Sequence, residues 1–362
     1  MESGRTRTRR RFLATLTSGV AAGLAGCGGI LGNPTFVEWR QPVPSPGGSF
    51  AVDDGTVYVG SEEGLAVLDA ESGERRGTNP AETAVLGRPA VSEGVAYYGA
   101  TDRVYAVDDA GEEQWQTELD GAVVACATDG NRVYAATTAD GADGGDGLYA
   151  LDPASGDELW ARSFESHPVA GAPAVDAGEV FLDAGGPASF DAASGDLNWR
   201  SERDADPATP AFSNLPAVTD SAVCYRDSRA ALTIVDRTSG DVTWTADLEF
   251  APASPVARDG VVYVGAMDGR LCYALDIQDE STLWRAPVRN VGAFGPAVDD
   301  DTVYASGGVR GSTLTALDAA TGDTRWEQTF AGSLSEPILS DERVFLSEAD
   351  GSDYSILAVR LR

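Results

Sequence analysis

The chain has 362 residues, of which 43% are hydrophobic, so it is long enough to bury a sizeable core. Its formal net charge is −31, because 57 acidic residues face 26 arginines and the sequence contains no lysine. This charge excludes the basic patch that nucleic-acid binding requires, and it argues against docking on an anionic membrane. The acids are spread over the loops, so we interpret them as the surface of an extremely halophilic protein, with an acidic partner-binding surface as the alternative.

The first 27 residues have the order of an export signal. A basic segment, residues 6–11, precedes apolar or small residues over 12–26, which are too few to span a bilayer. Thr-Arg-Arg-Arg-Phe-Leu resembles a twin-arginine motif with Arg9 and Arg10 as the pair, and Leu-Ala-Gly-Cys resembles a lipobox that acylates Cys27. We predict a signal peptide over 1–26 and a lipidated tether over 27–35, which holds the protein at the outer face of the cytoplasmic membrane by its lipid alone. The alternative is a plain signal peptide with an incidental cysteine.

All seven tryptophans follow one spacing. They are Trp39, Trp115, Trp160, Trp199, Trp244, Trp284 and Trp326. The first interval is about twice the others, so one position near residue 77 lacks its tryptophan. Most of them end the pattern A-x-D-x-x-[ST]-G-x-x-x-W, of which residues 150–160 and 316–326 are the clearest copies. The copy at 106–115 is one residue shorter, and the copy at 67–77 ends in Gly77. The sequence therefore contains a repeat of about 40 residues.

Each repeat also contains two earlier strand signals. The first is a Pro-Ala-Val-like segment, seen in one repeat at 89–91. The second follows it within the repeat and is a Val-Tyr-like segment, seen in another repeat at 261–265. Asp-Gly or a similar turn pair separates the two segments. Four short strands at this interval predict an all-β fold, a β-propeller of four-stranded antiparallel blades. Seven units end by residue 326, and the tail from 337 provides three strands of another. Residues 36–40 supply its missing strand, so we predict eight blades over 36–362, the last closed by the N-terminal strand.

The pattern resembles the PQQ-like (quinoprotein) repeat family over nearly all of 36–362. This resemblance implies that each tryptophan lies on the outermost strand and packs against the next blade, so we assign the seven tryptophans a structural role. We also expect the motif aspartate to form an Asx-type turn. Quinoprotein dehydrogenases of this family hold their quinone with an adjacent cysteine pair, a calcium site and a catalytic aspartate. No two cysteines are adjacent here, so we expect no cofactor, no metal and no catalytic residue.

The remaining candidates for chemistry are few. Cys126, Cys224 and Cys272 lie in apolar strand segments, which predicts buried free thiols. The only histidine, His167, lies in a loop that enters the fourth blade, and no serine has the context of a nucleophile elbow. We therefore interpret His167 as a surface residue.

Candidate binding residues come from the longer loops. Asp140, Asp143 and Asp146 lie between the second and third strands of the third blade, in a run whose spacing differs from that of a known calcium loop. Asp204 and Asp206 lie in the link from the fourth blade to the fifth. The eighth blade has a long connection at 347–355. Such connections share one face of a propeller, and we predict that this face is the binding surface.

These observations favour a lipid-anchored, monomeric propeller outside the cell that binds a protein or cell-envelope ligand and has no catalytic activity. In fold, blade count and anchor it resembles lipoproteins of the BamB family. The alternative is a PQQ-dependent or other quinoprotein-like oxidoreductase with a divergent site at the mouth of the channel. Fold alone does not separate these two functions.

Overall fold

The computed structural model describes residues 36–44, 49–81, 84–139, 145–164, 169–201, 215–227, 230–266, 270–289, 295–307 and 311–361. The chain divides into a unit Met1–Leu31 and a unit Gly32–Arg362, and all described residues belong to the second. The regular elements of these ranges are β-strands. No helix long and apolar enough to cross a membrane occurs among the described residues.

Seven four-stranded antiparallel sheets follow one another along the chain, and we number these blades 1 to 7. Blade 1 comprises β2 (Phe50–Asp53), β3 (Thr56–Ser61), β4 (Gly64–Asp69) and β5 (Arg75–Pro80). Blade 2 comprises β6 (Leu86–Ser92), β7 (Val95–Ala100), β8 (Arg103–Asp108) and β9 (Glu113–Glu118). Blade 3 comprises β10 (Ala122–Thr128), β11 (Val133–Thr138), β12 (Gly147–Leu151) and β13 (Glu158–Ser163). Blade 4 comprises β14 (Val169–Asp176), β15 (Glu179–Ala184), β16 (Pro187–Asp191) and β17 (Leu197–Arg200).

The next three blades have shorter innermost strands. Blade 5 comprises β18 (Ala217–Val218), β19 (Ala222–Asp227), β20 (Ala231–Asp236) and β21 (Val242–Asp247). Blade 6 comprises β22 (Val256–Arg258), β23 (Val261–Ala266), β24 (Leu271–Asp276) and β25 (Ser281–Pro287). Blade 7 comprises β26 (Ala297–Val298), β27 (Thr302–Ser306), β28 (Thr313–Asp318) and β29 (Thr324–Thr329).

Blade 8 joins the two ends of the described chain. Its strands are β30 (Ser333–Leu334), β31 (Ile338–Ser340), β32 (Arg343–Asp350), β33 (Asp353–Arg360) and β1 (Phe36–Val43). The order is β1-β33-β32-β30, and β31 also pairs with β32. The prediction of an eight-bladed propeller closed by the N-terminal strand is therefore confirmed.

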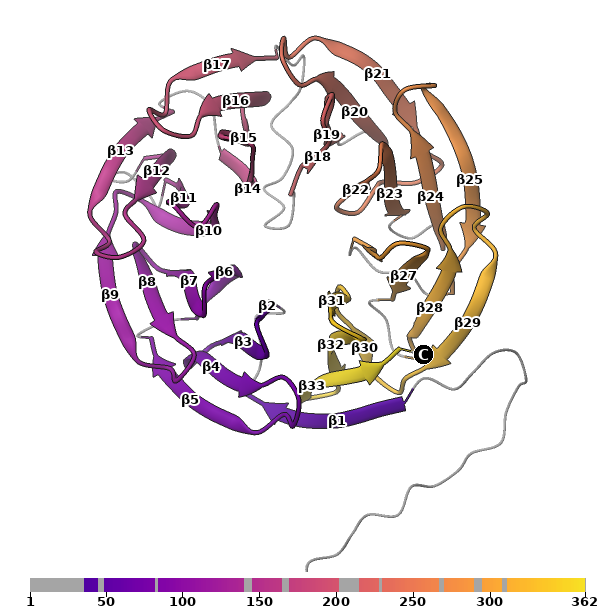
Figure 1. The fold of residues 1–362 in the computed structure, drawn as a ribbon, viewed down its shortest axis with the longest axis horizontal. Helices are drawn as coiled ribbons and strands as arrows, with labels where there is room; N and C mark the ends of the chain where they lie inside the picture. Colours follow the sequence, from indigo (N-terminus) through magenta and orange to yellow (C-terminus); the bar gives the residue numbers. More distant parts are fainter. Residues whose placement is uncertain are drawn as a thin grey trace, which may run out of the picture. The chain divides into compact units, whose positions relative to one another are not determined.

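The blades form a ring in which the first strand of each blade is innermost (Figure 1). The innermost strands contact one another in a closed cycle, from β2 through β6, β10, β14, β18, β22 and β26 to β31 and back to β2. A closed ring leaves no blade with an uncovered face, which removes the need for capping units at the ends of the repeat.

The register of blade 8 repeats that of the other blades although its strands come from opposite ends of the chain. Trp160 pairs with Ala150 in blade 3, and Trp39 pairs with Ala358 in blade 8, with a register shift beside each pair. Three ion pairs hold β1 to the rest of blade 8. The Glu38 carboxylate accepts from Arg343 of β32 at 2.6 Å and from Arg360 of β33 at 3.4 Å, and Arg40 contacts Glu348 of β32. Pairing and charge together fix the closing strand.

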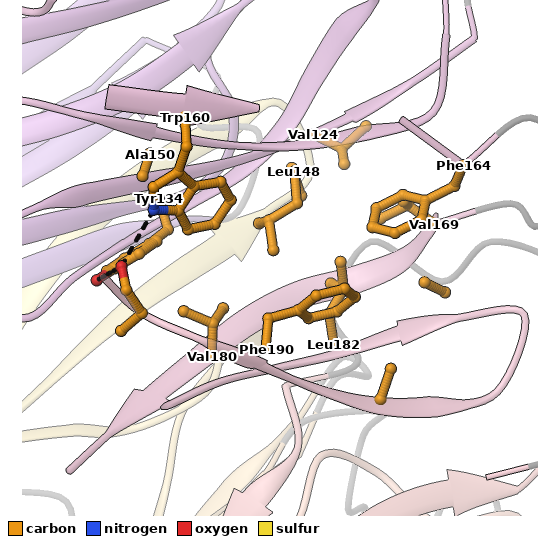
Figure 2. Close-up of a cluster of buried hydrophobic side chains, with 14 residues drawn as sticks. Val124, Tyr134, Leu148, Ala150, Trp160, Phe164, Val169, Val180, Leu182 and Phe190 are labelled. Atoms are coloured by element: carbon orange, nitrogen blue, oxygen red, sulfur yellow. Dashed lines mark hydrogen bonds between the residues drawn. The ribbon is translucent and has the colours of Figure 1, made fainter. Parts of the chain in front are cut away.

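The interface between blades 3 and 4 shows how neighbouring blades adhere (Figure 2). The indole Nε1 of Trp160 donates to the carbonyl of Ala192 in the next blade at 3.2 Å, and the Tyr134 hydroxyl donates to the same carbonyl at 3.3 Å. Leu148 and Phe190 are fully buried in the same cluster. Burying an aromatic side chain of this size removes ~200 Å² from water, which stabilises the interface by several kcal/mol.

Glycine in the motif makes room for these tryptophans. Gly195 has φ +73, and a Cβ placed there would lie 2.6 Å from Cε3 of Trp160. The same contact recurs in four other places: Gly73 with Trp39, Gly156 with Trp115, Gly240 with Trp199, and Gly322 with Trp284. In these five pairs the motif requires glycine both for its left-handed backbone and for the ring that covers it.

The interface between blades 1 and 2 is built differently. Gly77 replaces the tryptophan, and a Cβ there would lie 1.8 Å from the carbonyl oxygen of Ala110. A Cβ on Gly111 would lie 2.8 Å from the backbone nitrogen of Thr78. The two backbones therefore fill the space that an indole occupies elsewhere. The missing tryptophan and the shortened motif of blade 2, two irregularities of the sequence, meet at this interface.

One expectation about blade 8 is wrong. Residues 347–355 are not a long connection, because β32 and β33 continue through them and pair as far as Asp350 with Asp353. Only Gly351, with φ +70, and Ser352 form the turn. β1 covers the outer side of this hairpin and β30 pairs with its inner side, so backbone pairing on both sides keeps the segment in the sheet.

Candidate functional site

Two of the links between blades lie beside turns that join a second strand to a third strand. In the link after blade 2, the Leu119 backbone N–H donates to the carbonyl of Asp102 at 2.7 Å. In the link after blade 3, the Phe164 backbone N–H donates to the carbonyl of Asp146 at 2.8 Å. Asp102 and Asp146 belong to the turns between second and third strands. The carboxylate of Asp146 also accepts from the Ala139 backbone N–H at 3.1 Å, so this side chain closes the base of the turn.

Most of the residues that the sequence proposed for binding or anchoring fall outside the described ranges. These are Arg9, Arg10, Cys27, Asp140, Asp143, His167, Asp204 and Asp206. Asp146 is described, and its carboxylate has the structural contact given above. The binding role of the face that carries these loops therefore stays a prediction.

The repeated aspartates form the expected Asx-type turns. The Asp152 carboxylate accepts from the backbone N–H groups of Ala154 and Ser155 at 2.9 and 3.0 Å, and the other six copies make equivalent bonds. In blade 1 the Arg76 guanidinium and the Ser72 donors lower the pKa of Asp69 to about 2. These carboxylates satisfy backbone donors, which assigns them to turn structure.

The three described cysteines are free and buried, as the sequence predicts. Burial raises the pKa of each of the Cys126, Cys224 and Cys272 thiols to about 12, so they are poor nucleophiles. They lie in blades 3, 5 and 6. Within the described ranges, no group of three His, Cys, Asp or Glu residues could hold a metal ion. These residues do not fit the cysteine pair and calcium site with which quinoproteins hold their quinone.

The inner wall of the ring carries a feature that the sequence analysis missed. In each even-numbered blade, three residues ending in proline interrupt the pairing of the innermost strand. These tripeptides are residues 87–89 (Gly-Arg-Pro), 171–173 (Gly-Ala-Pro), 253–255 (Ala-Ser-Pro) and 335–337 (Ser-Glu-Pro). Proline lacks the N–H that the ladder needs, so it favours such an interruption. The central residue is charged only in blades 2 and 8, as Arg88 and Glu336.

Three serines fix the backbone beside Glu336. Ser335 donates from its N–H to the carbonyl of Ser347 at 2.9 Å, and the Ser347 N–H donates to the Ser335 hydroxyl at 2.8 Å. The Ser335 hydroxyl donates to the carbonyl of Glu336 at 3.1 Å, and the Ser306 hydroxyl donates to the carbonyl of Ser335. Glu336 is thus presented on a hydrogen-bonded turn anchored in blades 7 and 8.

Gly295 of blade 7 lies directly beside Glu336. A Cβ at this position would be 2.6 Å from the carbonyl oxygen of Ser254 in blade 6 and 3.5 Å from Oε1 of Glu336. Glu336 keeps some accessible surface, but the surrounding protein desolvates it and raises its pKa. The positive charge of Arg88 acts in the opposite direction.

Arg88 is held by its own neighbours on the opposite side of blade 1. Gly87 has φ +73, its carbonyl accepts from the Ser49 hydroxyl, and a Cβ there would lie 2.5 Å from the carbonyl oxygen of Val124. The turn is therefore wedged between blades 1 and 3. Arg88 itself is exposed. Arg88 interrupts β6 and Glu336 lies between β30 and β31, so both residues belong to the innermost strands of the ring. The sequence signal that could have found them is a charge at a repeat position that is otherwise small or apolar.

Comparison with known proteins agrees with this architecture. The family model described as outer membrane protein assembly factor BamB matches residues 36–116, 100–306 and 267–360. No curated protein matches the sequence. BamB from Moraxella catarrhalis has a similar structure, with a TM-score of 0.72, 17% identity, and coverage of 90% of this chain and 100% of that chain.

Two other solved structures share the fold. The computationally designed Ika8 protein has a TM-score of 0.69 and 18% identity, and the match covers 88% of this chain and 99% of that chain. Quinohemoprotein alcohol dehydrogenase from Comamonas testosteroni has a TM-score of 0.68 and 13% identity, and the match covers 90% of this chain and 76% of that chain. At these identities the likeness shows the fold alone.

Proposed function

We propose that this chain, which belongs to the family of the outer membrane protein assembly factor BamB, is a non-catalytic propeller that binds a protein or cell-envelope ligand. One observation carries the proposal. The described aspartates and tryptophans of the repeat are occupied in turns and blade interfaces, and the described cysteines are buried, so these groups have structural roles. A rigid ring with such repeats is suited to presenting loops to a partner.

The first experiment removes the acidic extension of blade 3 from the predicted binding face. Residues 140–144 are replaced by two glycines, which keeps Ala139 and Asp146 and their hydrogen bond. Chemical cross-linking in native membranes at high salt then compares the wild type with this variant. The control is Asp196→Ser, on the opposite face in the turn between β16 and β17. We expect one cross-linked species to disappear in the loop variant and to persist in the control. An unchanged set of species in the loop variant, and in a second variant lacking residues 202–213, would refute the binding face.

The membrane anchor is the second part of the proposal. A twin-arginine signal would export the folded ring, and acylation at Cys27 would hold it at the outer face of the cytoplasmic membrane. Cys27→Ala should release the exported protein into the soluble fraction. Replacing Arg9 and Arg10 by lysine should retain the precursor inside the cell. A protein that stays in the membrane fraction after Cys27→Ala would contradict the lipid anchor.

The oxidoreductase alternative rests on the same fold in the Comamonas testosteroni enzyme. It is tested by incubating the purified chain with PQQ and Ca²⁺, and by measuring the cofactor absorption and dye reduction with alcohols. We expect neither signal, because the described residues do not fit that cofactor. Stoichiometric uptake of PQQ with turnover would replace the binding function by catalysis.

A further inference from the structure

We propose that the rim between blades 5 and 6 binds a basic side chain of a partner protein, whose guanidinium stacks on the Trp244 indole and pairs with the Glu280 carboxylate. Trp244 lies on β21, and Glu280 directly precedes β25 in the turn after β24. Turns between third and fourth strands lie at the opposite end of the blades from the loops of the proposed binding face. This site therefore goes beyond that face.

Trp244 lacks the hydrogen bond that fixes most of the repeat tryptophans. Five indoles donate from Nε1, at 2.7–3.2 Å, to the residue after the motif aspartate of the next blade. For Trp244 this acceptor would be the carbonyl of Ile277, and no such bond joins these two described residues. Trp326 also lacks the bond, because it faces blade 8, in which no motif turn joins the last two strands. The described buried atoms without a hydrogen-bond partner are all arginine Nε atoms, so solvent reaches the Trp244 N–H.

The glycine that covers the ring elsewhere is Glu280 here. In the five glycine contacts described above, a Cβ would lie 2.4–2.7 Å from the nearest ring atom. Glu280 keeps the left-handed backbone of the motif, with φ +50, but its Cβ cannot occupy that place against an indole. Trp244 and Ile277 are both only partly buried, and both pack against the core cluster shared by blades 5 and 6. The rim is therefore more open at Trp244 than at the covered tryptophans.

The aromatic residue behind the ring is missing as well. The other six tryptophans each pack against an aromatic side chain on the second strand of their own blade, with ring centroids 5.8–6.3 Å apart. In blade 6 this residue is Tyr263, which packs against Trp284. The residue with the same pairing in blade 5 is Cys224. Trp244 thus departs from the repeat in its acceptor, its cover and its aromatic partner, and it is the tryptophan least committed to adhesion.

The turn of blade 6 adds negative charge without a base. It carries Asp276, Asp279 and Glu280, and the residue before Trp284 is Leu283. In blades 1 and 7 that position is an arginine, which pairs with the motif aspartate. Among the described residues, no ion pair involves the three carboxylates of the blade 6 turn. A half-buried indole beside such a turn favours a cation, because the ring face is electron-rich and the carboxylates supply the opposite charge.

The protein contains an internal version of the proposed contact. Arg162 lies over the Trp160 ring, 5.8 Å from its centroid, and pairs with Asp196 of the next blade at 3.0 Å. A guanidinium can do both at once, because its face stacks while its N–H groups bond in the plane. In blade 5 the residue in the place of Arg162 is Ala246, as the strand pairing shows. The chain therefore supplies no cation at this position, and the partner's guanidinium would take it.

The surroundings favour a protein segment as the source of the cation. Val242, two residues before Trp244 on the same edge strand, is 52% exposed and can contact the aliphatic stem of an arginine. The net charge of −31 attracts a basic segment and repels a second copy of this chain. The occupant that fits is thus a basic segment of a different protein.

The test is a titration of the purified full-length chain with N-acetylarginine amide, followed in the indole N–H region of its NMR spectrum. Trp244→Phe identifies the Trp244 resonance among the seven. We expect this resonance to shift saturably and the other six to shift less, because each of those rings packs against an aromatic side chain. The uncharged isostere N-acetylcitrulline amide should bind at least ~10-fold more weakly, because it lacks the charge that the ring and the carboxylate recognise.

Three variants separate loss of the site from loss of the fold. Glu280→Gly restores the glycine of the repeat, and we expect it to abolish the shift without lowering the melting temperature, because glycine favours this positive φ. Glu280→Gln removes the charge alone and should weaken binding by ~5-fold or more. The control is Asp196→Ser, which removes a carboxylate beside the covered Trp160 and should leave the titration unchanged.

Free arginine distinguishes a partner protein from a small molecule. Its own carboxylate is repelled by the turn, so it should bind more weakly than the capped probe. The proposal is overturned if the Trp244 resonance does not shift, if citrulline shifts it as readily, or if Glu280→Gly keeps the shift. Free arginine binding as tightly as the capped probe would also refute a partner segment. Loop variants that fail to lose a partner would leave this titration unaffected, so the two proposals fail separately.

Discussion

The outer rim and the inner wall of this propeller use polar residues in opposite ways. On the rim, an aspartate turn, a glycine and a tryptophan recur around the ring and contact the next blade in the same geometry. On the inner wall, the charged residues Arg88 and Glu336 occur once each. Repetition indicates a role that every blade needs, which is adhesion. A residue that departs from the repeat on an innermost strand is free of that role.

The largest expected effect is on the rim, at the interface between blades 3 and 4. Trp160→Ala removes a buried ring and its hydrogen bond to Ala192, and we expect it to lower the free energy of unfolding by about 3–5 kcal/mol. Urea unfolding followed by tryptophan fluorescence measures the change. Trp244→Ala is the matched control, because Trp244 is only partly buried and Glu280 occupies the glycine position opposite it. An equal loss in both variants would mean that the glycine contact is not what stabilises the rim.

A second prediction uses the interface that lacks a tryptophan. Gly77→Trp places a Cβ 1.8 Å from the Ala110 carbonyl oxygen, and we expect a loss of about 2–3 kcal/mol. Inserting one serine between Ala110 and Gly111 restores the full motif length of blade 2, and combined with Gly77→Trp it should recover at least about half of that loss. Equilibrium unfolding of both single changes and the combination tests this coupling. Additive destabilisation would show that the two irregularities are independent.

A third prediction concerns the aspartate turns of the rim. Asp69→Ala removes bonds to two backbone N–H groups and to Arg76, and we expect a loss of about 1 kcal/mol near neutral pH. The folded pKa of Asp69 is lowered to about 2, so its contribution is present above the unfolded pKa near 3.8 and disappears as the pH falls toward 2. Thermal unfolding of the wild type and the variant from pH 7 to pH 2 should therefore converge at the acid end. A difference that stays constant with pH would exclude the charge of Asp69 as its origin.

The smallest effect is expected on the inner wall, and it has the opposite sign. Burial raises the folded pKa of Glu336, so the carboxylate costs stability once the pH exceeds that value and costs none below the unfolded pKa. Glu336→Gln should therefore slightly raise the melting temperature at pH 7 to 8, and the gain should vanish at acid pH. Ser335→Ala, which removes the hydroxyl that holds this turn, should instead lower it at all pH values. A marked destabilisation by Glu336→Gln at neutral pH would show instead that the Glu336 carboxylate has a structural role in its turn.

Much of the fold follows from local sequence. The tryptophan spacing gave the number of complete blades, and the short tail after Trp326 together with Trp39 predicted how the ring closes. These predictions succeed because each blade contacts its neighbours through the same few residues, so the periodicity of the sequence reflects the contact geometry directly. The connection at 347–355 was misjudged, since its residues have no loop-forming feature beyond Gly351 and Ser352, and pairing with β1 and β30 decides its structure.

The sequence by itself therefore determined the blades, their turns, the buried thiols and the closing strand. Only the tertiary structure decided that Gly77 lies against the shortened turn of blade 2, and that blades 2 and 8 both lie next to blade 1. The physical reason is the closure of the ring. It places blade 8 beside blade 1 although their residues are far apart along the chain, and no local propensity encodes that contact.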